Sequence, residues 1–86
     1  MQTKSQQIKQ LRTDVRFALA QAEALSMAKP SLASEWLQLA RTDATKAYLL
    51  AQAAKRHHDR DARSALCAYA QIEVELNGAI ARLTLA

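Results

Sequence analysis

The sequence predicts an all-α protein, a three-helix antiparallel bundle that forms a single domain over residues 1–86. Three observations predict this fold. Apolar residues make up 50% of the chain and alanine is the most frequent of them, whereas Gly and Pro occur once each, so turn and strand signals are scarce. Apolar side chains recur at alternating spacings of three and four along three stretches, which is the period of a buried helical face. The connections between these stretches are short, and short connections make consecutive helices antiparallel neighbours.

The first helix is expected over residues 4–28. Thr3 is followed three residues later by Gln6, which is the spacing of a capping box, in which each side chain satisfies a free backbone N–H of the other residue. Pro30 is expected to mark the end of this helix, because the residue before a proline is pushed out of the helical region. The apolar stripe of the helix consists of Ile8, Leu11, Val15, Ala18, Ala22 and Leu25.

The second and third helices are expected over residues 32–57 and 60–84. Alanine fills almost all of the second stripe, and such small side chains let helix axes approach closely. The third stripe keeps its period through Gly78, so this glycine is expected inside the helix and not at its end. The second stripe consists of Leu37, Ala40, Ala44, Ala47, Ala51 and Ala54, and the third of Ala62, Ala65, Tyr69, Ile72, Leu76, Ala79 and Leu83.

The stretch KRHHDRD, residues 55–61, consists of ionisable side chains only. It admits three interpretations: a turn, a binding site for an anionic partner, or a metal site. A turn explains the order of the charges, because cations favour the carboxyl end of a helix and anions favour the amino end. Asp59 is then the predicted N-cap of the third helix. A zinc site needs three or four ligands at short distances. The two adjacent histidines point in different directions, so no metal site is expected.

No catalytic residue and no cofactor are predicted. Cys67 lies among apolar residues, where a buried and inert thiol is expected, and a single cysteine fits a reducing compartment. The amino terminus lacks the apolar run of a signal peptide, and no stretch approaches the roughly 20 apolar residues of a membrane span. We therefore expect a soluble, cytoplasmic protein that is not an enzyme and does not enter a membrane.

The basic residues are expected to gather at one end of the bundle, where the first helix begins, the second ends and the third begins. Eight basic side chains and only three acidic ones fall in these segments, a net charge of +5, while four basic and five acidic side chains, a net charge of −1, fall elsewhere. Such an end attracts anionic partners, although a solvated cationic end that only aids solubility has the same composition. The residues predicted to bind an acidic protein surface or an anionic ligand are Lys9, Arg12, Arg16, Lys55, Arg56, Arg60 and Arg63.

Several large apolar residues lie outside the three stripes, and a monomeric bundle would leave some of them in water. Either the stripes are wider than these positions indicate or the chain associates with itself. Oligomerisation supplies the core that a small scaffold lacks, so we expect a homo-oligomer. The residues in question are Phe17, Leu19, Trp36, Leu39, Tyr48, Leu49, Leu50 and Val74.

The segment EWLQLARTDATKAYLL, residues 35–50, resembles a helix of the small phage anti-CBASS proteins that act as cyclic-oligonucleotide sponges. The resemblance implies an all-helical oligomer that sequesters a cyclic nucleotide, with Arg41 and Thr42 as ligand-binding residues. A structural interpretation stands beside it, in which Trp36 is a buried anchor and residues 41–43 form a solvent-facing turn of the helix. The matching residues are Trp36, Leu37, Leu39, Ala40, Arg41, Thr42 and Asp43.

Together these observations favour a small non-enzymatic binding protein of a phage or other mobile element. We expect it to counter a host defence by occupying a protein partner or by sequestering a cyclic nucleotide. The alternative is a basic accessory or regulatory protein that binds nucleic acid, with the same Lys and Arg side chains on phosphates. The two differ in salt response, because affinity that depends on several phosphate contacts falls steeply with salt.

Overall fold

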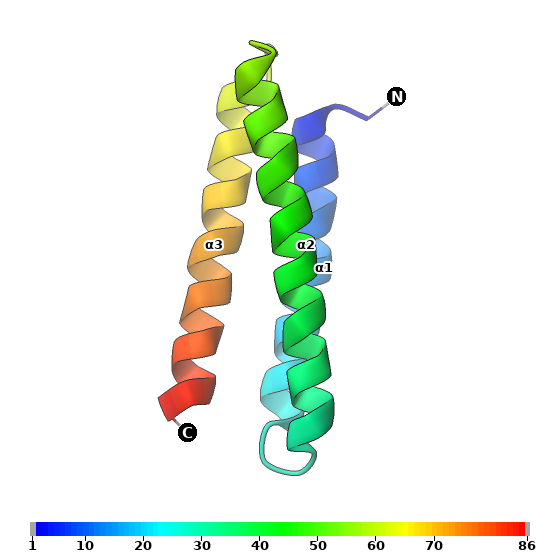
Figure 1. Cartoon of the computed structure of the whole chain (residues 1–86), viewed down its shortest axis with the longest axis vertical. Helices are drawn as coiled ribbons and strands as arrows, with labels where there is room; N and C mark the ends of the chain where they lie inside the picture. The colour runs from blue at the N-terminus through cyan, green and yellow to red at the C-terminus, as the bar shows by residue number, and fades with distance from the viewer. Residues whose placement is uncertain (1, 86) are drawn as a thin grey trace.

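The computed structural model describes residues 2–85, which form three helices: α1 (Lys4–Leu25), α2 (Pro30–Arg56) and α3 (Ala62–Leu85). In Figure 1, α1 and α3 run downward and α2 runs upward between the two loops, so α2 is antiparallel to both of the others. Each helix packs against both of the others in a bundle with extents of 45 × 24 × 14 Å. The predicted all-α three-helix bundle is confirmed. None of the three helices, over the part of the chain described, is long and apolar enough to cross a membrane.

The start of α1 has the predicted capping box. The backbone N–H of Gln6 donates to the Thr3 hydroxyl at 3.1 Å, and the backbone N–H of Thr3 donates to the Gln6 side-chain oxygen at 2.9 Å. A second donor of the first turn is satisfied from outside the helix, because the backbone N–H of Ser5 donates to Asp61 Oδ2 at 2.8 Å. The first turn of α1 is therefore fixed both by its own sequence and by the segment that precedes α3.

The connection between α1 and α2 differs from the prediction. Helix α1 ends at Leu25 and not at residue 28, and Ser26 closes it with both its backbone N–H and its hydroxyl directed to the Glu23 carbonyl. Pro30 is the first residue of α2 and not a marker that lies before a helix starting at residue 32. A proline fits this position because its fixed φ suits the helix and its missing N–H would have had no partner there.

The turn between α2 and α3 confirms the break expected within KRHHDRD. Helix α2 ends at Arg56, and His58 adopts a left-handed backbone conformation with φ of 53°. The N–H of Asp59 donates to the Ala54 carbonyl at 3.0 Å and the N–H of His58 to the Lys55 carbonyl at 3.2 Å, which is the Schellman pattern of helix ends. A side chain at a position that usually belongs to glycine carries a conformational cost.

The start of α3 does not follow the prediction. Asp59 is not its N-cap, because the helix begins at Ala62 and the Asp59 carboxylate bonds to Lys4. The contact between Lys4 and Asp59 connects the start of α1 to the turn, and a local sequence pattern does not predict such a long-range contact.

The core is narrow and rich in alanine, as the three stripes predict. Ile8, Val15 and Ile72 are the largest side chains described as fully buried. Partly buried side chains, among them Trp36 and Leu50, pack against the edges of this core. The buried alanines are Ala18, Ala22, Ala33, Ala40, Ala44, Ala47, Ala51, Ala54, Ala65, Ala68 and Ala79.

Candidate anion-binding site

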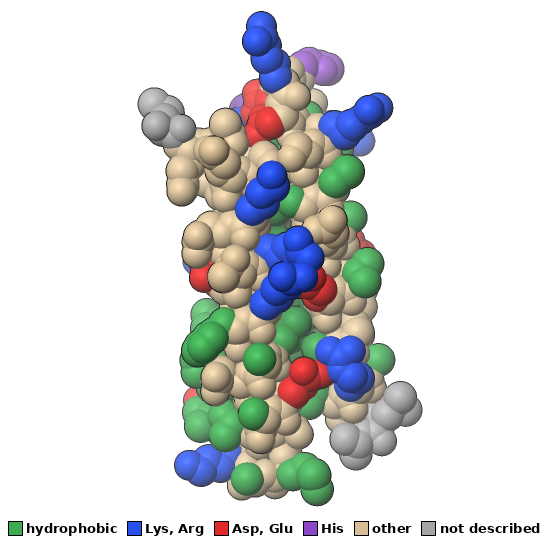
Figure 2. Space-filling view, turned by 180° about the vertical axis from the view of Figure 1, so that it is seen from behind, with side chains coloured by type: hydrophobic (Ala, Val, Ile, Leu, Met, Phe, Trp, Pro, Cys, Tyr) green, Lys and Arg blue, Asp and Glu red, His purple; other side chains and the backbone are tan. Residues whose placement is uncertain are grey.

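Five of the predicted binding residues lie exposed at the end of the bundle where α2 turns into α3. They come from the first half of α1, the last turn of α2, the turn itself and the first turn of α3. In the space-filling view of Figure 2, Lys and Arg side chains gather over the upper half and the middle of the molecule. We call the five exposed residues the basic end; it consists of Lys9, Lys55, Arg56, Arg60 and Arg63.

The two acidic residues of the turn, Asp59 and Asp61, bond to the start of α1 and not to the cations of the basic end. Among residues 2–85 its five cations make no ion pair, whereas the neighbouring Lys4 Nζ lies 2.7 Å from Asp59 Oδ2. A shallow hollow of about 550 Å³ lies here and is lined by Gln52, Lys55, Arg56 and His58. Cations that have no ion pair within the fold can pair with an external anion without breaking an internal contact.

Arg12 and Arg16, which the sequence placed with the basic end, are engaged within the fold. Arg12 Nη2 lies 2.9 Å and Arg16 Nη2 2.8 Å from the same oxygen, Oε1 of Glu75 on α3. The Nε groups of both arginines donate to that oxygen as well, at 3.1 and 3.0 Å. One carboxylate thus balances half of the charge of two guanidinium groups, and both arginines are committed to the contact between α1 and α3.

The electrostatic state of Glu75 follows from this arrangement. Burial by itself raises the pKa of the carboxyl group, but the hydrogen bonds and charges of Arg16 and Arg12 outweigh it, and the pKa of Glu75 is lowered. Its second oxygen, Oε2, is buried without a hydrogen-bond partner. All the stabilising contacts of the carboxylate therefore converge on one atom.

Glu75 is one of the five acidic side chains that the sequence count placed outside the basic end, whereas the structure sets it against Arg12 and Arg16. Helices α1 and α3 start at the same end and run in parallel, so positions equally far from their starts lie side by side. Arg16 is twelve residues beyond the start of α1, and the same count from Ala62 reaches residue 74, next to Glu75. Counting along both helices from their shared end is the signal that would have found this cluster.

The two residues carried over from the resemblance lie in different surroundings. Arg41 is exposed and lines a hollow of about 550 Å³ between α2 and α3, together with Tyr48, Tyr69 and Glu73. The two tyrosine rings meet edge to face with their centroids 5.5 Å apart. Thr42 does not belong to the lining, and its hydroxyl donates to the Gln38 carbonyl one turn earlier in α2.

Burial raises the pKa of the Tyr69 hydroxyl in this hollow, and the charge of Glu73 adds to the effect. The hydroxyl therefore stays protonated at neutral pH and can donate a hydrogen bond. The hollow thus offers a cation, hydroxyl groups and an aromatic edge on one surface.

The solitary cysteine is not in the environment that the sequence indicated. Cys67 is exposed, because it lies outside the stripe of α3 that faces the core. Within the described part of the chain, no three His, Cys, Asp or Glu side chains lie close enough together to hold a metal ion.

No protein-family model matches this chain, and no curated protein or solved structure is significantly similar to it. The resemblance of residues 35–50 to the anti-CBASS sponge proteins thus stays a prediction. The functional argument depends on the surfaces of this bundle alone.

Proposed function

We propose that the protein is a small non-enzymatic binding protein whose basic end docks on an acidic protein surface. The observation that carries the proposal is a group of five exposed cations from all three helices and the turn between α2 and α3, none of which forms an ion pair with another described residue. Positive charge held in this way steers an acidic partner into place and fixes its orientation. In a phage or other mobile element, such a protein would counter host defence by covering a functional surface of its target.

An acidic protein surface fits this end better than nucleic acid does. The basic end is compact, since the bundle is only 24 × 14 Å across its two shorter extents. Proteins that bind single-stranded nucleic acid combine cations with aromatic side chains on which bases stack, and no aromatic residue lies within KRHHDRD or the first turn of either α1 or α3. Phosphate contact is the rival mode and becomes an outcome of the test.

Two charge-matched variants test the proposal. Lys55→Glu with Arg56→Glu reverses two cations of the basic end, while Lys29→Glu with Arg41→Glu reverses two exposed cations elsewhere. Each pair lowers the formal net charge from +4 to 0. Arg12 and Arg16 are unsuitable for this purpose, because reversing them would also break their contacts with Glu75.

The assay measures binding to an acidic peptide and to a DNA oligonucleotide at several salt concentrations. We expect the first pair to lose peptide binding and the second pair to keep it, because specific docking depends on position and not on net charge. Equal loss in both pairs would mean that only net charge matters and would contradict the proposal. Tighter binding to DNA, with the steep salt dependence of phosphate contacts, would replace the acidic protein with nucleic acid.

A second candidate function is the sequestration of a cyclic nucleotide, and the hollow around Arg41 favours it. A guanidinium group there can pair with a phosphate, and the neighbouring Tyr48 and Tyr69 offer aromatic contact to a base. Native mass spectrometry of protein purified from cells at low salt would detect a retained nucleotide. We expect Arg41→Ala to abolish its retention and Thr42→Ala to leave it intact, and a protein without any adduct would count against this function.

Self-association completes the proposal. The core contains few large side chains, and Phe17, Leu39 and Leu49 are exposed. A narrow bundle of this kind gains stability when a second chain covers its apolar surface.

A further inference from the structure

The face that α1 and α2 form on the side away from α3 carries much of the exposed apolar surface of the molecule. Leu39 is 46% and Leu49 60% exposed on α2, and Phe17 on α1 lies edge to face against Trp36 with 5.6 Å between ring centroids. Leu32 is exposed near the start of α2 as well. We call this surface the α1–α2 face.

Helix α2 carries a second apolar stripe on this face, next to its alanine stripe. The spacing alternates between four and three without interruption, which is the heptad pattern of helices that pack side by side. Its two central positions are charged, and the positions on both sides of them are apolar. The stripe consists of Leu32, Trp36, Leu39, Asp43, Lys46, Leu50 and Ala53.

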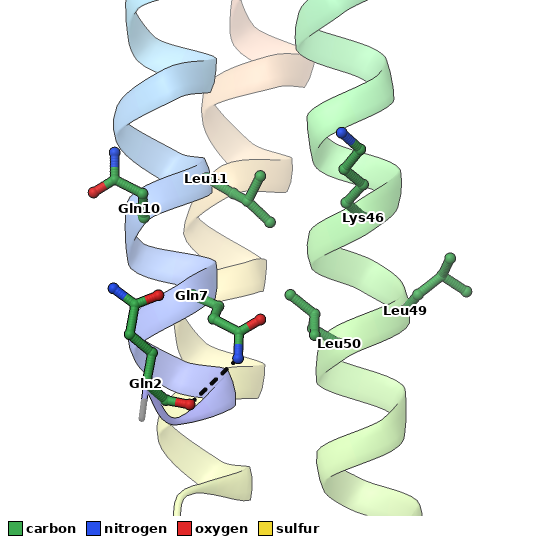
Figure 3. Close-up of a pocket in the computed structure, with 7 residues that line it drawn as sticks. All are labelled: Gln2, Gln7, Gln10, Leu11, Lys46, Leu49 and Leu50. Carbon is green, nitrogen blue, oxygen red and sulfur yellow. Dashed lines mark hydrogen bonds between the residues drawn. The ribbon is translucent and has the colours of Figure 1, made fainter.

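A groove of about 560 Å³ runs between the two helices at the end of the face where α1 begins and α2 ends. Figure 3 shows Leu11 and Leu50 directed toward one another from the facing helices, while Leu49 points outward from α2. Three glutamines, Gln2, Gln7 and Gln10, line the groove as well. Lys46 of α2 also lines the groove, so its apolar floor is bordered by three amide side chains and one cation, which suits contact with another protein surface that carries an anion.

Asp43 occupies the middle of the stripe and has little solvent contact. The residue is 8% exposed, and its closest basic group is Lys46 Nζ at 4.0 Å from Oδ1. Burial raises the pKa of the Asp43 carboxyl, Lys46 opposes this effect, and the negative charge of Asp14 on α1 adds to it. A carboxylate in this position gains stability from an additional cation.

We propose that a second copy of the chain covers the α1–α2 face, with the two α2 helices antiparallel and a twofold axis between Asp43 and Lys46. This axis places Asp43 of each copy against Lys46 of the other and Leu39 of each copy against Leu50 of the other. The same symmetry brings Trp36 opposite Ala53, a large side chain against a small one. The stripe is therefore complementary to itself in the antiparallel orientation.

Charge complementarity selects this orientation. In a parallel pair with the same stripe in contact, Asp43 would meet Asp43 and Lys46 would meet Lys46, and like charges in a seam disfavour the wrong partner arrangement. In the antiparallel pair, each Lys46 lies between Asp43 of its own chain and Asp43 of its partner.

The available area agrees with a stable dimer. A helix of 27 residues such as α2 is roughly 40 Å long, and two packed helices are roughly 20 Å wide. The α1–α2 face therefore covers on the order of 800 Å², close to the roughly 800 Å² that each partner contributes to a standard interface. The inference identifies the surface for the self-association proposed above and does not depend on the basic end, which lies outside the stripe.

Sedimentation analysis of the full chain over a concentration series is the first test, with Leu39→Glu as the disrupting variant and Val74→Glu as the control. Val74 is 72% exposed on α3, away from the stripe. We expect a species of twice the 9.5 kDa chain mass for the native protein and for Val74→Glu. Leu39→Glu should raise the dimer dissociation constant at least about 100-fold, since it sets a carboxylate against Leu50 of the other copy on both sides of the twofold axis, while circular dichroism should show unchanged helix content.

Cross-linking tests the orientation independently of those variants. In a Cys67→Ser background, Leu39→Cys and Leu50→Cys proteins are mixed and treated with a short bismaleimide. We expect cross-linked dimers in the mixture and only traces in either protein alone, because the antiparallel seam brings position 39 to position 50. Cross-linking of each protein with itself, a dimer that survives Leu39→Glu, or a native protein that stays monomeric at millimolar concentration would each overturn the proposal.

Discussion

Replacing Glu75 by glutamine tests whether the cluster with Arg12 and Arg16 holds α1 and α3 together. The substitution keeps the shape of the side chain and removes its charge, so two guanidinium groups lose their common anion. A hydrogen bond to a charged group contributes about 1.5–3 kcal/mol to the free energy of unfolding. Arg12 is partly buried and is expected to contribute near the lower limit of that range, whereas the exposed Arg16 contributes about 0.5 kcal/mol.

The expected loss is therefore about 2 kcal/mol, which corresponds to a fall in melting temperature of about 10 °C for a domain of this size. Thermal unfolding followed by circular dichroism at pH 7 measures it. Glu35→Gln removes the same charge from an exposed position of α2 and should change the free energy of unfolding by less than about 0.5 kcal/mol.

The pH dependence gives a second readout of the same cluster. The pKa of Glu75 is lower in the folded chain than its ordinary value of 4.5. Its contribution to stability is therefore complete above pH 4.5 and disappears as the pH falls through the folded-state pKa. Glu75→Gln should lose part of the acid-induced fall in stability below pH 4.5. A variant with the native melting temperature and the native acid profile would refute the assigned role.

Three further substitutions have defined outcomes, each measured by chemical denaturation. Gly78→Ala should raise the free energy of unfolding by about 1 kcal/mol, because the added methyl group meets only Arg82 Nη1 at 3.4 Å and alanine favours a helix interior; a loss of stability would contradict this reasoning. His58→Gly should also stabilise the chain by about 1 kcal/mol, since glycine adopts the left-handed conformation without steric cost, and a destabilised variant would show that the imidazole makes a compensating contact. Ile72→Ala should cost about 2–5 kcal/mol as one of the largest fully buried side chains, whereas a cost under about 1 kcal/mol would mean that the narrow core collapses around the lost volume.

The helices themselves could be predicted from the sequence because their signals are local. The capping box of Thr3 and Gln6 and the three apolar stripes depend only on spacing, and the structure confirms the capping box and most stripe positions. Leu19, which was expected outside the stripes, belongs to the core. Pro30 was misread because a proline ends one helix or begins the next, and the two outcomes share the same local pattern. The expectation for Asp59 was wrong for a related reason: its carboxylate forms an ion pair with Lys4 and does not cap α3.

The candidate site could be predicted only in part, because counter-charges are set by contacts between helices. Lys55, Arg56, Arg60 and Arg63 are exposed near the turn, as the order of charges indicated. The pairing of Arg12 with Glu75 depends on the relative height of α1 and α3, which the lengths of α2 and of both loops determine together. The relative height of the two helices therefore cannot be read from any single segment of the sequence.

The bond from the Ser5 amide to Asp61 has a consequence for local opening of the native state. Amide protons in the first turn of a helix generally exchange with solvent quickly, because they have no partner within the helix. Here the Ser5 proton is held by a residue 56 positions later in the chain, and the Ser5 and Ser64 hydroxyls lie 2.8 Å apart beside it. The beginning of α1 can then fray only when the entry to α3 opens as well, so hydrogen exchange at these two distant segments should occur in a single cooperative event.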